Sequence, residues 1–211
     1  MKPQVLLILA AALAFPVFAS GQDRPASDAA MTATLADTRA ALRDLWVGHI
    51  VWVRNVVDAR FEGNEQAAKA AEQQVVAIAR AIAGSIEPFY GAAASEKLFG
   101  QLAGHWGAIS DYLDATRADS KTDQDAAFRQ LVDNANELAQ FLGGANPQLP
   151  VDTLTSLLTA HGSHHVQQIR QFDAGQFEQE AETWATMKDH MYVIADALAG
   201  GIARQFPDKF R

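Results

Sequence analysis

One short phrase occurs three times in this chain at a constant interval. Each copy places a large apolar residue three positions before a histidine, and the copies end at His49, His105 and His161. The two intervals are the same, because 105 − 49 and 161 − 105 both equal 56. An interval of this size is typical of a repeated supersecondary unit. The sequence therefore predicts an internal triplication in which one position of each copy carries an imidazole.

The residues around each histidine show the periodicity of an amphipathic helix. In the first copy, Leu42, Trp46, His49 and Val53 recur at steps of three and four residues. This spacing places them on one face of a helix, and the face is apolar enough to be buried. The other two copies follow the same pattern, so each histidine is expected on the buried face of its helix.

A second helix is expected after each of these. Alanines four residues apart mark it at positions 79 and 83, 135 and 139, and 195 and 199. The step from the first pair to the second (135 − 79) equals the histidine interval, and the next step (195 − 135) is longer by four, which predicts an insertion in the last hairpin. Glycine and proline separate the units, and the strict alternation of a strand is absent. We therefore predict an all-α fold of six helices, paired as three αα-hairpins in one bundle.

The ends of the chain suggest its organisation. Residues 1–20 have the charged start, short apolar run and small residues of a signal peptide, and the run is too short for a stable membrane anchor. Residues 21–28 are expected to form a flexible lead and residues 29–211 a single helical bundle domain. The three units would cover about 31–91, 92–147 and 148–207. This organisation predicts a periplasmic or secreted protein with no stable membrane anchor after signal cleavage.

Composition excludes several classes of function. The chain has 17 basic and 25 acidic residues and a formal net charge of −8, which argues against nucleic acid or an anionic membrane as the partner. It has no cysteine, so disulfides, thiolate metal sites and thiol nucleophiles are excluded. The expected partner is a metal ion or small ligand, and no protein partner can be assigned.

The repeated histidines predict a metal site. Equivalent residues of a pseudo-symmetric bundle approach one another near its axis, so His49, His105 and His161 should meet there. Sets of imidazoles are common ligands of zinc, copper and iron. His165 follows His161 by four residues and so lies on the same helix face, a common spacing for two ligands of one ion. The sequence therefore predicts a transition-metal site whose metal remains unidentified.

The second helices supply further candidates. Matching their alanine phrases makes Arg80, Asn136 and Asp196 equivalent, and pairs His190 with Gln130. Polar residues at matched buried positions need hydrogen-bond partners or a ligand. We expect Asn136, Asp196 and His190 to orient the ligating histidines or to supply a fourth ligand, and a buried Arg80 to neutralise Asp196 or bind an anion.

A structural interpretation competes with this one. The three repeated histidines could hydrogen-bond across the helix interfaces to Asn136, Asp196 or Gln130 and fix how the hairpins dock. The protein would then be a non-enzymatic helical binding or scaffold protein. The sequence has no Glu-x-x-His pair, covalent haem motif, nucleophile elbow or phosphate-binding loop. No catalytic residue is therefore predicted, and no feature of the sequence requires an enzymatic function.

Three segments resemble a family of bacterial helical proteins whose function is uncharacterised. They are residues 45–54 (LWVGHIVWVR), 134–139 (NANELA) with Asn146 and Pro147, and 195–210 (ADALAGGIARQFPDKF). The resemblance covers most of the chain after residue 20 and implies the repeat-bundle fold without an activity. The chain departs from that family's pattern at Arg80, where an amide or acid is usual, and by its additional His165.

A second resemblance is to the DinB-like metal-binding bundles. Their ligands are one histidine on an early helix and a His-x-x-x-His pair on a later one, which His49, His161 and His165 resemble. The likeness implies a metal-dependent transferase or hydrolase acting on thiols. The triplication and the six-helix length differ from the four-helix plan of that family, which puts this activity in doubt.

Overall fold

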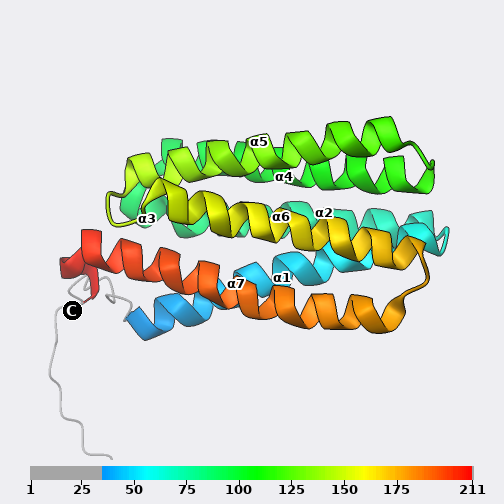
Figure 1. Ribbon diagram of the computed structural model, residues 1–211. Helices are drawn as coiled ribbons and strands as arrows, with labels where there is room; N and C mark the ends of the chain where they lie inside the picture. The colour runs from blue at the N-terminus through cyan, green and yellow to red at the C-terminus, as the bar shows by residue number, and fades with distance from the viewer. Residues whose placement is uncertain (1–34, 211) are drawn as a thin grey trace, which may run out of the picture. The chain divides into compact units, whose positions relative to one another are not determined.

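The structure, a computed structural model, describes residues 35–210 and contains no strand in that range. Its six long helices are α1 (Leu35–Phe61), α2 (Glu65–Ser85), α4 (Ala92–Arg117), α5 (Lys121–Ala145), α6 (Val151–Asp173) and α7 (Phe177–Gln205). A one-turn helix, α3 (Glu87–Tyr90), links α2 to α4, and a 3₁₀ turn, η1 (Pro207–Phe210), follows α7. The predicted all-α fold with six helices is confirmed (Figure 1).

Two predictions about location concern the beginning of the chain. The expected signal peptide at residues 1–20 and the flexible lead at 21–28 lie outside the described residues. Among residues 35–210, none of the helices combines the length and the apolar character needed to cross a bilayer.

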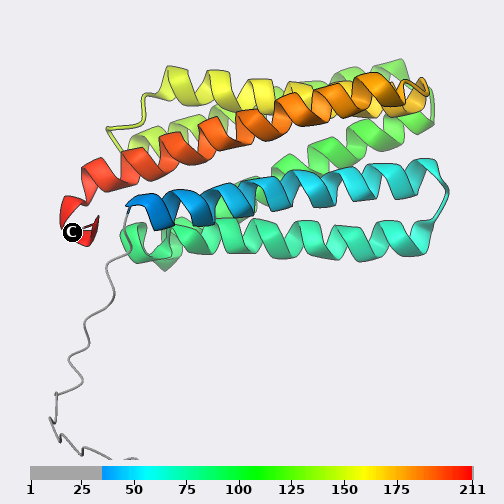
Figure 2. The ribbon, with the colours of Figure 1, turned by 90° about the horizontal axis from the view of Figure 1, so that it is seen from below.

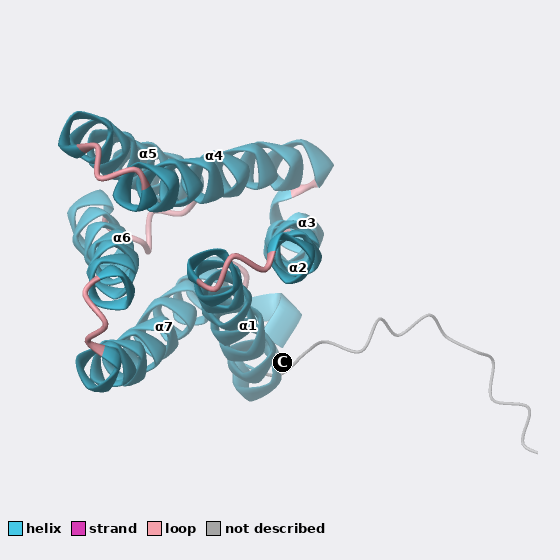
Figure 3. Cartoon of the chain, turned by 90° about the vertical axis from the view of Figure 1, so that its right-hand side faces the viewer, coloured by secondary structure: helices cyan, strands magenta, loops and turns pink. Residues whose placement is uncertain are grey.

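The long helices pack as three antiparallel pairs: α1 with α2, α4 with α5, and α6 with α7. Contacts of α2 with α4, of α5 with α6, and of α7 with α1 join the pairs into a closed ring, which Figure 3 shows end-on. Helix α6 also touches α1 and α4, so the first helices of the three pairs face the interior. These three helices run in the same direction, and the turns within the pairs lie at one end of the bundle (Figures 1 and 2).

The turns within the three helix pairs have the same geometry. Each contains a residue with positive φ, at Gly63 (71°), Asp119 (51°) and Gly175 (66°), and these positions recur at the interval that separates the histidines. After each, an N–H bonds the carbonyl five residues earlier: Asn64 to Ala59, Ser120 to Ala115 and Gln176 to Gln171, at 2.8, 2.9 and 2.8 Å. Such bonds satisfy carbonyls at a helix end. The local geometry therefore repeats at the interval seen in the sequence, while the triplication itself stays a prediction.

The contacts correct one equivalence drawn from the sequence. Asn134 Nδ2 donates to the carbonyl of Gln101 at 2.9 Å, and His190 Nε2 bonds the carbonyl of Leu157 at 2.8 Å, with the same sequence separation between the partners in both cases. His190 therefore takes the place of Asn134, and its expected match to Gln130 is wrong. Helices α2, α5 and α7 begin at equal intervals along the chain but have 21, 25 and 29 residues. The additional residues of α5 and α7 therefore lengthen these helices at their C-terminal ends.

The apolar interior consists of two clusters separated by the histidines. Along α1, Trp46 belongs to one cluster and Val53 to the other, and His49 lies between them in the sequence. Along α6, Leu158 belongs to the first cluster and Val166 to the second, and His161 and His165 lie between them in the sequence. The histidines thus form a polar layer in the middle of the bundle.

A buried carboxylate connects three helices near this layer. Glu180 of α7 is 1% exposed and accepts two hydrogen bonds from Arg54 of α1, at 2.7 and 2.6 Å. It also accepts one from Gln168 of α6 at 2.6 Å. Buried ionised groups need partners of this kind, and the three side chains fix α1, α6 and α7 relative to one another.

Candidate metal centre

Four histidines meet in the interior of the bundle. They are His49 of α1, His105 of α4, and His161 and His165 of α6, and each offers one ring nitrogen that lies within 4.8 Å of the others. All four residues are buried, with exposures of 5, 6, 2 and 1% in that order. The three repeated positions and the additional histidine one turn later therefore come together, as the sequence led us to expect.

The rings are close enough to share one ion. The centroids of His161 and His165 are 4.6 Å apart, those of His105 and His161 are 5.2 Å apart, and those of His49 and His161 are 5.4 Å apart. Nitrogens that bind one tetrahedral ion at about 2.0 Å lie about 3.3 Å from one another. The observed upper limit of 4.8 Å exceeds this value by an amount that small rotations of the imidazoles can close.

Five ring nitrogens of this group are buried without a hydrogen-bond partner in the described chain. Within residues 35–210, the Nε2 atoms of all four histidines are buried and unpaired, as is the Nδ1 atom of His161. A buried polar atom without a partner costs about 1–3 kcal/mol, and native interiors contain few of them. This group therefore has several unpaired nitrogens and could hold a metal ion.

Burial keeps these imidazoles neutral. Desolvation, with a smaller contribution from neighbouring His105, lowers the pKa of His49 to about 3. Desolvation lowers the pKa of His105 to about 4. The pKa values of His161 and His165 also fall well below the usual value, because of burial first and the other histidines second. Neutral imidazole is the form that binds a metal ion.

The residues predicted to support the histidines do not join this group. Both carboxylate oxygens of Asp196 bond Arg43 on the partly exposed outer side of α1 and α7, at 2.8 and 2.6 Å. His190 bonds the carbonyl of Leu157 and faces the ring of His164, 5.3 Å away. Asn136 is half-buried and lies next to, but not among, the residues that border the histidines.

The expected buried set of Arg80, Asn136 and Asp196 is likewise wrong. The side chain of Arg80 is 57% exposed, pairs with Glu96 at 2.9 Å and stacks on the ring of Phe99 at 3.7 Å. It therefore neither neutralises Asp196 nor faces the histidines. The alanine phrase located the buried face of each second helix, and its polar neighbours point away from that face.

Apolar side chains wall the site. A small space borders His49, His105 and His161, and its other lining residues are Trp46, Leu102, Ala135, Leu138 and Leu158. The Trp46 ring meets those of His49 and His161 edge-on, with centroids 6.5 and 6.4 Å away. From the sequence, Trp46 is one of four tryptophans expected to fill the interior, one of which could wall a pocket, and its position one turn before His49 is the signal that singles it out.

No protein-family model, curated protein or solved structure matches this chain. Function therefore has to be inferred from the geometry and chemistry of the site. The resemblances to the bacterial helical family and to the DinB-like bundles stay expectations.

Proposed function

We propose that this protein binds one transition-metal ion through His49, His105, His161 and His165. The observation that carries the proposal is the convergence of four buried imidazoles, from three helices, whose Nε2 atoms have no partner among the described residues. A bound ion would accept one nitrogen from each of the four rings at once. The location that fits best is periplasmic or secreted, because of the sequence of residues 1–20.

The donor set limits the metals to be tested. Imidazole nitrogens suit zinc, copper and iron, whereas calcium and magnesium prefer oxygen ligands. His161 and His165 would chelate the ion from one helix, and His49 and His105 would complete the site from α1 and α4. The low pKa values of these imidazoles mean that an ion would not have to displace protons near neutral pH.

The structural alternative receives less support from the same contacts. It expects the repeated histidines to bond Asn136, Asp196 or Gln130 across the helix interfaces. Asp196 instead pairs with Arg43, and the Nε2 atoms of the histidines are left unpaired within the described chain. A polar network with this many unpaired atoms would stabilise the docking of the hairpins poorly.

A metal-dependent enzyme is the second candidate function. It is favoured by the presence of His165 in the same group as His49 and His161, the three positions that resemble the DinB-like ligands. Catalytic sites keep one coordination position open for water or substrate. With His105 as a fourth donor, a four-coordinate ion would keep no open position, so simple binding fits the four-imidazole group better than catalysis.

Metal counting tests the proposal. The purified, metal-free chain is incubated separately with Zn(II), Cu(II), Cu(I) and Fe(II), unbound metal is removed, and bound metal is measured. We expect about one equivalent of at least one metal and a rise in the melting temperature with that metal. Fewer than about 0.2 equivalents for every metal would contradict a specific site.

A further inference from the structure

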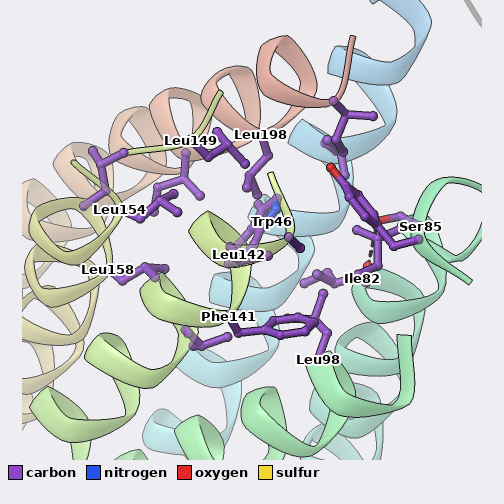
Figure 4. A pocket seen from close by; sticks show the side chains of 18 residues that line it. Trp46, Ile82, Ser85, Leu98, Phe141, Leu142, Leu149, Leu154, Leu158 and Leu198 are labelled. Carbon is purple, nitrogen blue, oxygen red and sulfur yellow. Dashed lines mark hydrogen bonds between the residues drawn. The ribbon is translucent and has the colours of Figure 1, made fainter. Parts of the chain in front are cut away.

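A second feature of the interior is an apolar pocket beside the histidine layer. It lies at the end of the bundle where α1, α4 and α6 begin and α2, α5 and α7 end. Figure 4 shows the surrounding side chains, among them Trp46, Leu142, Leu149, Leu154, Leu158 and Leu198. Of the 18 lining residues, none is charged. The pocket therefore offers no partner for an ionic ligand.

The two hydroxyl groups in the lining already have partners, whereas Nε1 of Trp46 is buried without one. The Ser85 hydroxyl donates to the carbonyl of Ile82 at 2.6 Å (Figure 4). The Tyr90 hydroxyl donates to Gln205 at 2.7 Å and accepts from Asn146 at 2.9 Å. A ligand that needs several hydrogen bonds would lose those it makes to water and could regain at most one here, from the Trp46 indole N–H. The chemistry of the lining therefore selects uncharged, apolar molecules.

The size of the cavity limits such a molecule further. The cavity volume is about 40 Å³. A single water needs roughly 10–15 Å³, and an engineered apolar cavity of about 150 Å³ binds benzene or xenon. The pocket can thus hold a molecule of a few atoms without rearrangement, and an aromatic ring or a long hydrocarbon chain would require the side chains to move.

A second, smaller space lies between this pocket and the histidines. It has a volume of about 10 Å³ and borders His49, His105 and His161. Both spaces are lined by Trp46, Leu138 and Leu158. An apolar molecule that passes these three side chains would reach the imidazole rings without meeting a charged group on the way.

We propose that this pocket admits a small uncharged apolar molecule, of the class of dioxygen, and brings it beside the histidine group. Entry of the molecule into the pocket does not depend on a bound metal. Only its encounter with a metal ion at the histidines rests on the proposed metal binding. The uncharged, mostly apolar lining and the small volume thus favour a diatomic gas over an anion or a larger organic metabolite.

Paramagnetic relaxation by dissolved dioxygen tests this directly in the metal-free full-length protein. Leucine methyl groups and histidine rings are isotope-labelled, and proton relaxation rates are compared under dioxygen and under nitrogen. Leu113 is fully buried in the other apolar cluster and serves as the internal reference. We expect at least about a twofold larger enhancement at the Leu142 and Leu158 methyls than at Leu113. The His161 ring protons should show a similar excess.

The proposal is overturned if the relaxation enhancement at the pocket methyls is no larger than that at Leu113. If the methyls show an excess but the His161 ring protons do not, passage to the histidines is overturned. Leu142→Trp should fill the pocket and remove the excess at Leu158. Phe128→Trp, on the same helix but at an exposed position outside the pocket, should leave it unchanged. Because no metal is present, a negative result here is distinguishable from a failure to bind metal.

Discussion

His161 and His165 lie one turn apart on α6 with their ring centroids 4.6 Å apart, and the Nε2 atom of each is buried without a hydrogen-bond partner in the described chain. The four-residue spacing places both imidazoles on one face of the helix. The other two imidazoles reach this pair only through the packing of α1 and α4 against α6. Local helix geometry therefore provides half of the site and tertiary packing provides the rest.

Replacing one member of this pair tests the ligand assignment. His165→Gln should weaken binding of the preferred metal by about 100-fold or more, because loss of a ligand should exceed the 10–100-fold effect of losing a residue that only orients one. His164→Gln is the matched control, since His164 is adjacent, half-buried and outside the group. Competition titration against a chelator gives both affinities. Equal affinities for the two variants would remove His165 from the site.

Acid should destabilise the metal-free protein more steeply than an ordinary helical bundle. The pKa values of His49 and His105 are about 3 and 4 in the folded protein, against about 6.5 when unfolded. Below pH 6.5 the unfolded chain therefore binds more protons, and the free energy of unfolding falls as the pH decreases toward 4. Each such histidine contributes about 1.4 kcal/mol per pH unit.

Urea unfolding at pH 7, 6 and 5 measures this dependence. His105→Gln should reduce the slope below pH 6 by about one histidine's share. A slope that is the same in the wild type and in this variant would show that His105 titrates normally in the folded state.

Close packing of the loop before α6 should make Gly201 intolerant of a methyl group. An added Cβ would lie 2.6 Å from Cγ and Cδ2 of Leu149, so backbone or core side chains would have to shift. We expect Gly201→Ala to lower the free energy of unfolding by about 1–3 kcal/mol. Gly107→Ala, in the interior of α4 with nothing near the added atom, should raise it by about 0.5–1 kcal/mol. Urea denaturation measures both changes, and a neutral Gly201→Ala would argue against this packing.

The middle hairpin turn should be improvable. Asp119 adopts a φ of 51°, where the equivalent turns have Gly63 and Gly175. Glycine adopts this backbone region without steric cost, whereas an L-residue is strained there. Asp119→Gly should raise the free energy of unfolding by about 0.5–1 kcal/mol and Gly63→Ala should lower it by about as much. Opposite signs in urea denaturation support the assigned turn geometry, and equal signs contradict it.

The buried carboxylate of Glu180 should depend on its partner. Arg54→Met leaves Glu180 with only Gln168, and breaking a buried pair costs about 3–5 kcal/mol. The Arg54 side chain is 40% exposed, so solvent screening should reduce the loss to about 2 kcal/mol. Arg80→Met is the control, because Arg80 pairs with Glu96 at the surface and should change stability by less than about 1 kcal/mol. Similar losses for both variants would show that burial of Glu180 is unimportant.

The sequence predicted the features that depend on periodicity. The six helices follow from apolar spacing and from the glycine and proline residues that separate the units. The four histidines follow from the constant interval between His49, His105 and His161 and from the four-residue spacing of His161 and His165. These patterns specify which face of a helix is buried, and the fold buries those faces together.

The sequence did not predict features that depend on the axial position of a residue relative to the neighbouring helices or on the side chains of those helices. A shift of four residues is about one turn, so the alanine phrase could not distinguish Gln130 from Asn134 as the equivalent of His190. Asp196 was predicted to be buried because no sequence pattern identifies Arg43 as its ion-pair partner. The apolar pocket depends on how residues from every long helix fit together, which no local pattern records.

The four histidines come from all three hairpins, with His165 the last along the chain. During synthesis, no shorter nascent polypeptide can present the complete set until α6 has left the ribosome and docked against α1 and α4. Ion capture would then act as a checkpoint on assembly, since a truncated or misassembled product would hold at most a partial, weak site. Cells could in this way couple loading of the centre to completion of the protein.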